Sequence, residues 1–178
     1  MSKKQDILDA TLKLFTENGA RATSTKSIAL QANTSEALIF KHFGSKDGLL
    51  EEIIKTGYQD AVKFLTQFFV YQNAQEYLIK TIDLPIMLVN SNFDFWRMQY
   101  KILPLNPIAQ QYHNNFLNPS ENKLTDIFNE LGYQNAQIES DLLILVIDGI
   151  WKNYVSEKIT LEQANSMAVL LKKKYNLI

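Results

Sequence analysis

Cysteine is absent from this chain of 178 residues, and its absence excludes several classes of protein. Without thiols, a disulfide framework, a thiolate metal site and a cysteine nucleophile are all ruled out. Long apolar runs are missing as well: no stretch of roughly 18 apolar residues occurs, and the start MSKKQDILDA lacks the apolar core of a signal peptide. We therefore expect a cytoplasmic protein that does not associate with a membrane.

A large excess of charge of either sign is also missing. The net charge is −1, which excludes a uniformly basic nucleic-acid-binding protein but leaves room for a local basic patch. Apolar residues make up 46% of the chain and charged residues 21%, which is typical of a folded globular protein rather than a disordered one. The length allows a single domain, or a small head on a larger body.

Catalytic and metal-binding motifs are not found. The segment Gly44-Ser45-Lys46-Asp47-Gly48 does not match the G-x-S-x-G nucleophile pattern, and no phosphate-binding glycine loop occurs. His113 lies in QYHNNF, where no second histidine or carboxylate stands at ligand spacing. We therefore expect neither an enzyme nor a bound metal or cofactor.

What the sequence does contain is helical periodicity. No segment alternates as a β-strand would, so the pattern predicts an all-α fold. Proline, glycine and polar stretches divide the chain into helices, and Pro85 should kink or break one of them. The first helix should start at a capping box of Ser2 and Gln5 and end at Asn18-Gly19. The later helices are expected near 25–31, 35–41, 45–70, 74–91, 93–103, 107–116, 119–131, 136–156 and 160–175.

The two short helices at 25–31 and 35–41 have the dimensions of a helix-turn-helix. Isolated helices shorter than about 12–15 residues are marginal in water, so the second one needs packing partners. Ile39 and Phe43 form its inward-facing pair, and Asn33 supplies a left-handed turn before it. In a helix-turn-helix, the first helix crosses the phosphate backbone and the second enters the major groove.

A specific resemblance supports this interpretation. The segment GARATSTKSIALQANTSEALIFKHFGSKDGLL (19–50) resembles the DNA-binding head of the TetR family of bacterial transcriptional regulators. The segment VIDGIW (146–151) is similar to the penultimate helix of such proteins. The resemblance implies a helix-turn-helix DNA-binding domain at 1–46 and a helical effector-binding and dimerisation domain at 47–178. The matching positions are Gly19, Thr23, Ser24, Ile28, Ala29, Ala32, Ser35, Ile39, Phe40, His42, Phe43, Ser45, Lys46, Asp47 and Leu49.

The resemblance also implies which residues contact DNA. Some would hold phosphates through lysine charge or helix N-terminal N–H groups, and others would face bases. Phe40 stands where tyrosine is usual, so one hydroxyl contact is lost. Leu38, which we expect to be exposed, suits a thymine methyl group. The expected DNA-contacting residues are Thr25, Lys26, Ser35, Glu36, Ala37, Leu38, Phe40, Lys41, His42 and Lys46.

For the larger domain, the family resemblance implies an apolar small-molecule pocket, and the candidates to line it are Trp96, Arg97 and Tyr100. Most of the other aromatic side chains should be core. The segment 136–156 is apolar on two sides, which indicates a helix buried on both sides and suggests a dimer interface. The expected interface residues are Leu142, Leu145, Gly149, Met167 and Leu171.

Together these features predict a homodimeric, ligand-released repressor that binds a pseudo-palindromic DNA operator. One alternative of another class stays open: a helical interaction protein or small-molecule carrier whose head no longer binds DNA specifically. That alternative is motivated by the small excess of positive charge in the head, by Glu36 and by the missing tyrosine hydroxyl at Phe40.

Overall fold

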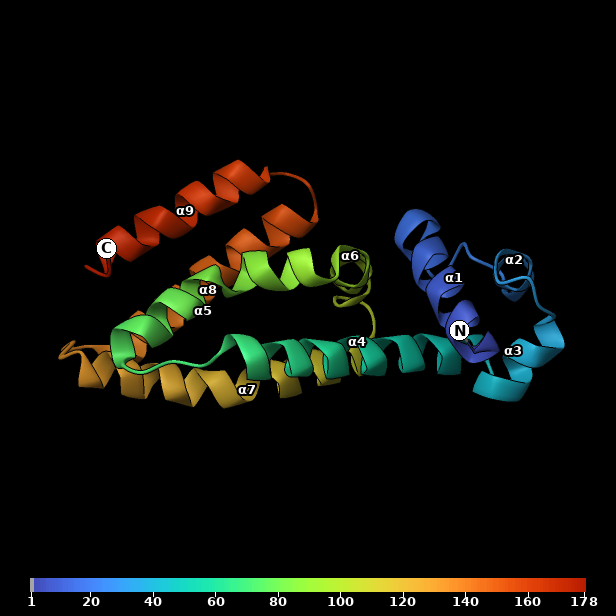
Figure 1. The fold of residues 1–178 in the computed structure, drawn as a ribbon, viewed down its shortest axis with the longest axis horizontal. Coiled ribbons are helices and arrows are strands. Elements are labelled where there is room, and N and C mark those ends of the chain that lie inside the picture. The colour runs from blue at the N-terminus through green and yellow to red at the C-terminus, as the bar shows by residue number, and fades with distance from the viewer. Residues whose placement is uncertain (1) are drawn as a thin grey trace. The chain divides into compact units, whose positions relative to one another are not determined.

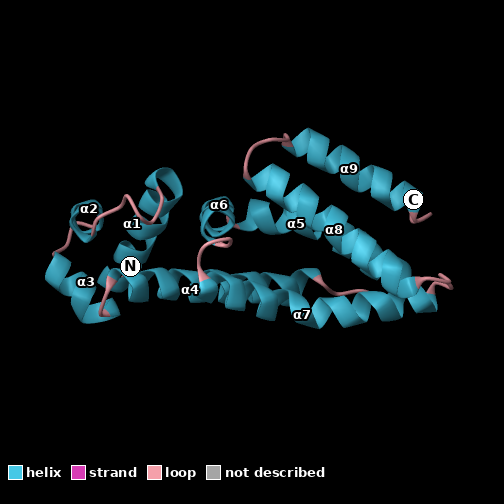
Figure 2. Cartoon of the chain, turned by 180° about the vertical axis from the view of Figure 1, so that it is seen from behind, coloured by secondary structure: helices cyan, strands magenta, loops and turns pink. Residues whose placement is uncertain are grey.

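The computed structural model of the chain describes residues 2–178, except the side chains of residues 118–122. Every regular element formed by the described residues is a helix, and none is a strand, so the predicted all-α fold is confirmed (Figures 1 and 2). The helices are α1 (Lys3–Asn18), α2 (Thr25–Gln31), α3 (Glu36–Phe43), α4 (Lys46–Phe68), α5 (Ala74–Ser91), α6 (Phe93–Ile102), α7 (Pro107–Glu130), α8 (Ala136–Val155) and α9 (Leu161–Lys174).

One predicted helix division is wrong: the helices expected at 107–116 and 119–131 are one continuous helix, α7. The helix expected at 74–91 is present as α5, and of the kink or break expected at Pro85 the break does not occur. Pro85 is buried and lies between the buried residues Ile82 and Ile86. A proline removes one backbone hydrogen bond, but most helical stability in a folded protein comes from tertiary packing of the apolar face. Packing on both sides of the proline therefore keeps the helix intact.

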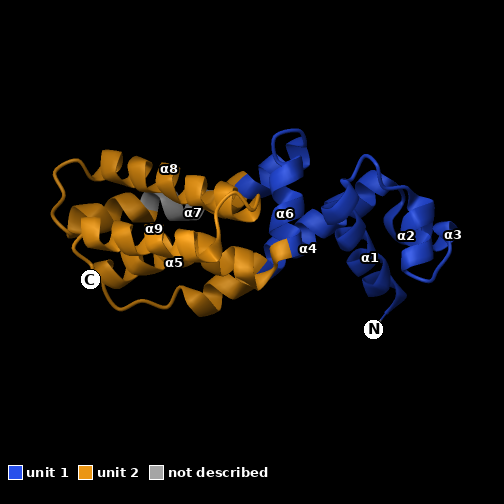
Figure 3. Ribbon diagram, turned by 90° about the horizontal axis from the view of Figure 1, so that it is seen from above, with its two compact units in different colours: residues 1–60, 94–113 blue, residues 61–93, 114–178 orange. Residues whose placement is uncertain are grey.

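The chain forms two compact units, which do not follow the sequence in simple order (Figure 3). Unit 1, blue in Figure 3, contains residues up to 60 together with 94–113, and unit 2 contains 61–93 together with 114–178. The helices α4 and α7 each contribute residues to both units. Helix α6 belongs to the same unit as the predicted head, so this unit extends past residue 46. The functional division at residue 46 stays a prediction.

Unit 2 is built on the packing of α5, α8 and α9, which lie side by side (Figure 1). Its core contains the fully buried side chains of Leu78 and Ile82 from α5 and Leu143 from α8. A partly buried ion pair, 2.7 Å from Lys172 Nζ to Asp83, joins α9 to α5. Apolar burial holds these helices together, and the ion pair fixes their register.

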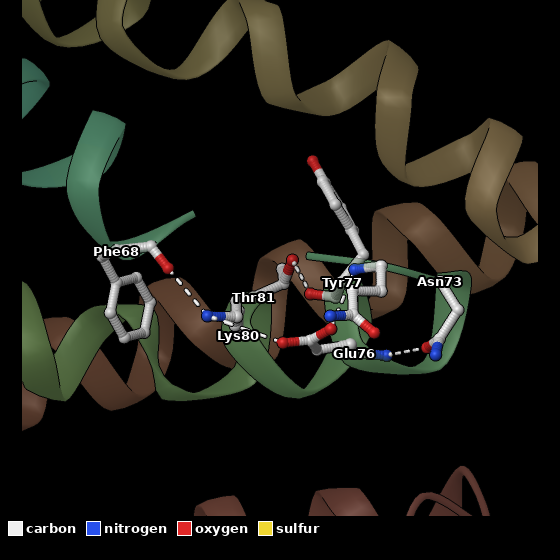
Figure 4. Close-up of polar contacts among 7 residues, drawn as sticks. Phe68, Asn73, Glu76, Tyr77, Lys80 and Thr81 are labelled. Carbon is white, nitrogen blue, oxygen red and sulfur yellow. Dashed lines mark hydrogen bonds and ion pairs between the residues drawn. The ribbon is translucent and has the colours of Figure 1, made fainter. Parts of the chain in front are cut away.

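Polar contacts join the end of α4 to the start of α5 within unit 2 (Figure 4). Asn73 Oδ1 accepts a hydrogen bond from the Glu76 backbone N–H at 2.8 Å and so caps α5. Lys80 Nζ donates to the Phe68 carbonyl at 2.9 Å and lies 5.2 Å from the centre of the Phe68 ring. Glu76 lies 3.8 Å from the same ammonium. One lysine thus satisfies a carbonyl at the C-terminal end of α4, where no helical partner exists.

In unit 1, α6 packs closely on α4 at a glycine. A Cβ atom placed on Gly57 would overlap the ring of Phe95, whose side chain is buried. The neighbouring Tyr58 ring contacts Phe95 edge-to-face at 5.5 Å between centroids. Gly57 is therefore required by the approach of an aromatic ring rather than by its own backbone conformation.

We expect Gly57→Ala to destabilise the protein by about 1–3 kcal/mol, because overpacking a tight contact outweighs the gain in helix propensity. Thermal unfolding followed by circular dichroism measures the change. The cost should shrink in a Phe95→Leu background, where the smaller side chain leaves room for the added methyl group. An equal cost in both backgrounds would mean that Phe95 is not the obstacle.

Candidate nucleic-acid interface

Each of the first four helices begins with a serine that caps it. In every case the serine Oγ accepts a hydrogen bond from the backbone N–H three residues later, which satisfies one of the unpaired donors of a helix start. These caps explain why helices as short as α2 and α3 have sharp boundaries. The pairs and their Oγ–N distances are Ser2–Gln5 at 3.3 Å, Ser24–Ser27 at 3.0 Å, Ser35–Leu38 at 3.2 Å and Ser45–Gly48 at 2.9 Å.

The capping box expected at Ser2 is only half formed. The Gln5 side chain donates to Asp9 at 2.9 Å instead of reaching back to the Ser2 backbone. A complete capping box does occur in unit 2, between Thr160 and Gln163 at the start of α9.

The turn between α2 and α3 is built as expected. Asn33 adopts a left-handed conformation with φ of 48°, and the Thr34 N–H donates to the Ala29 carbonyl at 2.9 Å. Gly44, with φ of 73°, then ends α3. These two positive-φ positions set where α3 begins and ends, so they define the length of the exposed helix.

Helix α3 presents one anchored face and one open face. Ile39 is completely buried and is the anchor, whereas Phe43 is only half-buried. The open face carries side chains that were expected to contact DNA: Ala37, Phe40, Lys41 and His42 are exposed. Leu38 is half-buried, so the expectation that it is exposed holds only in part.

Three lysines lie on the elements expected to meet DNA, Lys26 and Lys46 facing phosphates and Lys41 facing bases. Lys26 and Lys41 are exposed, and Lys46 is half-buried with its ammonium 6.0 Å from the centre of the Phe15 ring. Among the residues that the structure describes, none of the three forms an ion pair with a carboxylate. Their charges are therefore available to an anionic partner.

Two of the expected DNA-contacting residues bind one another. Thr25 Oγ1, at the start of α2, donates to Glu36 Oε2, at the start of α3, at 2.5 Å. This contact links the two helices of the helix-turn-helix and leaves Glu36 half-buried. Sequence reasoning missed it because the residues are eleven positions apart, and only the angle between α2 and α3 brings them together.

A second charged contact joins α1 to α4. Lys4 Nζ lies 2.7 Å from Glu52 Oε1, and Lys55 lies 4.0 Å from the same carboxylate. The hydrogen bond from Lys4, opposed by partial desolvation, lowers the pKa of the Glu52 carboxyl below its usual value. The charges of Lys4 and Glu52 thus neutralise one another, while Lys26, Lys41 and Lys46 have no carboxylate partner.

The residues expected to line an effector pocket lie in unit 1. Trp96 is buried and contacts Tyr58 edge-to-face, while Arg97 and Tyr100 are half-buried. Next to them is a polar network that sequence reasoning did not find. Its centre is Gln99 on α6, and no sequence motif marks this glutamine among the other polar residues of the amphipathic helix.

Gln99 is completely buried, and its Nε2 donates to Tyr58 Oη at 2.9 Å and to the Ala109 carbonyl at 3.3 Å. Tyr58 Oη also lies 2.9 Å from His113 Nδ1. Burial raises the pKa of the Tyr58 hydroxyl above its usual value, so this tyrosine stays protonated. Gln99 Oε1 has no hydrogen-bond partner among the described residues. Buried polar atoms usually have a hydrogen-bond partner, so this oxygen is an exception within the network.

The expected dimer residues differ in exposure. On α8, Leu145 is 69% exposed, Leu142 is exposed, and a Cβ atom placed on Gly149 would meet nothing within 4 Å. On α9, Met167 is exposed, but Leu171 packs partly against the core of unit 2. Leu142, Leu145 and Met167 are thus exposed and Gly149 has open space beside it, whereas Leu171 contributes mainly to the fold.

Within the described part of the chain, no group of three or more His, Cys, Asp or Glu side chains is arranged to hold a metal ion. None of the helices described there is long and apolar enough to cross a membrane.

Comparison with known proteins identifies the head. Residues 7–53 match the family described as bacterial regulatory proteins, tetR family. Over 48 residues, 27% of this chain, the sequence is 52% identical to YvkB of Bacillus subtilis strain 168, an uncharacterized HTH-type transcriptional regulator. That match spans only 25% of YvkB.

Two solved structures share the fold of the whole chain. One is a proposed transcriptional regulator from Saccharomonospora viridis in complex with choline, with a TM-score of 0.78, 19% identity and coverage of 96% of this chain and 95% of that one. The other is the regulator FadR from Bacillus subtilis in complex with stearoyl-CoA, with a TM-score of 0.70, 21% identity and coverage of 94% and 96%. Residues 7–53 are thus similar to the TetR family of bacterial regulatory proteins, and the chain as a whole has the fold of these two solved structures.

We expect Lys4→Gln to raise the pKa of Glu52 toward its usual value of about 4.5, because the main hydrogen bond to its ionised form is lost. In the unchanged protein, the stability gained from this carboxylate is present above the unfolded pKa and is lost as the pH falls through the lowered folded pKa. Side-chain carboxyl NMR during a pH titration measures the shift. An unchanged Glu52 pKa in the variant would show that Lys4 does not control it.

Proposed function

We propose that the protein is a sequence-specific, DNA-binding transcriptional regulator that acts as a homodimer and is released from DNA by a small molecule. The observation that carries the proposal is the open face of α3. The buried side chain of Ile39 anchors that helix on its opposite face. Three lysines without a carboxylate partner lie on α3 and on its neighbours in the chain: Lys26 on α2, Lys41 on α3 and Lys46 on α4. A helix about as wide as the major groove, supported by cations that can neutralise phosphates, fits duplex DNA.

Each part of the head has a role in this proposal. Helix α3 enters the major groove with Ala37, Leu38 and Lys41 toward base edges, while Phe40 lies at the groove wall. The starts of α2 and α4 supply phosphate contacts through Lys26 and Lys46. The remaining expected contacts are Thr25, Ser35, Glu36 and His42.

Dimerisation follows from the geometry of the operator. A single short helix contacts only a few base pairs, so two copies are needed to read two half-sites about 34–36 Å apart. The exposed apolar side chains of α8 and α9 support a self-interface. Leu142, Leu145 and Met167 are exposed, and Gly149 leaves open space through which a partner helix can approach.

For the effector, we propose a small apolar molecule with a polar group, bound near Trp96, Arg97 and Tyr100. The unpaired oxygen of the buried Gln99 supports a polar group in that ligand. The two solved regulators with the same fold are bound to choline and to stearoyl-CoA, so this fold accommodates small molecules of different chemistry. The effector must bind the DNA-free state more tightly, and operator DNA must then weaken effector binding by the same factor.

Selection from a pool of random DNA duplexes tests the proposal, at a fixed salt concentration near physiological because phosphate contacts make affinity salt-dependent. We expect an enriched inverted repeat with half-sites about one helical turn apart. Leu38→Ala should then relax the preference at one thymine, since the apolar contact with its methyl group is lost.

The absence of any enriched sequence, with binding that vanishes as salt rises, would contradict the proposal. It would favour the alternative function, a helical carrier or interaction protein with a head that no longer reads DNA. The Thr25–Glu36 contact is the feature of the structure that favours this alternative, because it occupies two of the expected DNA-contacting side chains.

We expect Glu36→Gln to strengthen operator binding about two- to fivefold at fixed salt, because a negative charge is removed from the surface that faces phosphates. Fluorescence anisotropy with a labelled operator measures the change. Glu51→Gln, the same change at an exposed position on α4, serves as the control. Weaker binding by Glu36→Gln would show instead that Glu36 accepts a hydrogen bond from a base.

We expect Leu145→Glu to convert the dimer into a monomer, because it places a charge in the middle of the proposed apolar interface. Sedimentation velocity at micromolar concentration measures the mass. Leu105→Glu is the matched control, since Leu105 is 71% exposed and lies in unit 1. Dimerisation that survives Leu145→Glu would exclude this face of α8.

A further inference from the structure

A cavity of about 390 Å³ lies within unit 1, and none of the residues assigned above to the effector lines it. It is open to solvent on one side and is lined by the end of α1, the turn that follows it, the start of α4 and the segment at the end of α6. All of these segments belong to the same compact unit. Its volume is in the range of small-molecule sites.

Positive charge dominates the lining of this cavity. Arg21, Lys46 and Lys101 all line it, and Asp47 is the one acidic side chain among its lining residues. The formal charge of the lining is therefore +3 − 1 = +2, in a chain whose net charge is −1. None of the three cations forms an ion pair within the described part of the chain.

One of these cations is fixed in place. Lys101 Nζ donates to the carbonyl of Thr16 at 2.6 Å, near the end of α1. Thr16 Oγ1 in turn donates to the Asp94 carbonyl at 2.9 Å, at the start of α6. A carbonyl partner leaves the ammonium charge uncompensated and two of its N–H groups open to an anion. The site is thus pre-organised on the α6 side.

The rest of the lining is apolar. Phe15 and Leu50 form buried wall, Ile102 is half-buried, and Leu105 is 71% exposed at the rim. An inorganic anion would leave this wall in contact with water, whereas an anion that carries a hydrocarbon part would cover it. Cations without a carboxylate partner, beside an apolar wall, are complementary to a molecule that combines a negative charge with an apolar part.

We propose that this cavity binds an organic carboxylate with an apolar tail or ring. The carboxylate pairs with Arg21 and Lys101, and the apolar part lies against Phe15 and Leu105. The site is separate from the region of Trp96, Arg97 and Tyr100. If the proposed DNA binding holds, Lys46 serves both this cavity and the phosphate backbone, so carboxylate and DNA compete for its charge.

Calorimetric titration of the full-length, DNA-free protein with octanoate tests the site. The comparison compounds are 1-octanol, which lacks the charge, and inorganic phosphate, which lacks the apolar part. We expect octanoate to bind measurably and both comparison compounds to bind at least about tenfold more weakly. Because no DNA is present, a failure to find an operator leaves this result unaffected.

Variants then locate the binding site. Arg21→Gln and Leu105→Asn alter exposed side chains, so both should fold normally. Each should weaken octanoate binding about three- to fivefold, and Arg21→Gln combined with Lys101→Gln should weaken it about tenfold or more. Lys13→Gln removes the same charge from an exposed position on α1 that does not line the cavity, and it should bind octanoate as the unchanged protein does.

Three results would overturn the proposal. The first is the absence of octanoate binding. The second is equal binding of 1-octanol or of phosphate, which would remove the need for either the charge or the apolar wall. The third is octanoate binding that is unchanged in the Arg21→Gln, Lys101→Gln double variant, which would place the ligand elsewhere in the protein.

Discussion

The burial of Ile39 is the constraint on which the DNA-binding head depends. Helix α3 has eight residues, too few to stay helical in isolation. Burying one isoleucine side chain contributes about 1.5–3 kcal/mol, and this contact holds the helix against its neighbours. Because the anchor lies on one side only, the opposite face is left for recognition. The serine caps and the two positive-φ turns fix the length of the helix, so the exposed face keeps a defined register.

The basic surface of the head depends on which lysines form ion pairs rather than on how many lysines there are. Lys4 and Glu52 neutralise one another on the side formed by α1 and α4, while Lys26, Lys41 and Lys46 keep their charges. A protein with nearly zero net charge can thus still present a locally basic surface. The Thr25–Glu36 contact works against this arrangement, since it keeps a carboxylate at the reading surface. In the proposed function, the balance between these contacts controls how tightly the head holds DNA.

Helix α6 has a position that the sequence did not indicate. It packs on α4 through Phe95 and Gly57, and it is held to α1 through Thr16 and Lys101. The aromatic residues of α6 therefore belong to the same compact unit as the DNA-binding head. A ligand bound beside Trp96, or in the cationic cavity beside Lys101, would act directly on elements that support α3. In the proposed release mechanism, the ligand and the DNA-binding helices therefore lie in the same compact unit.

The sequence by itself determined the all-α class, most helix boundaries and the helix-turn-helix, because these depend on local periodicity, caps and turn residues such as Ser35, Asn33 and Gly44. It could not show that α7 is a single helix, or whether Pro85 breaks the helix at 74–91, since packing from distant residues outweighs a local proline signal. Only the tertiary structure decided which polar groups meet. The Thr25–Glu36 bond, the buried Gln99 beside Tyr58, and the cavity between α1, α4 and α6 join residues from 11 to 85 positions apart. Contacts between residues so far apart in the sequence depend on the angles between helices, and these angles are set by core packing rather than by any local pattern.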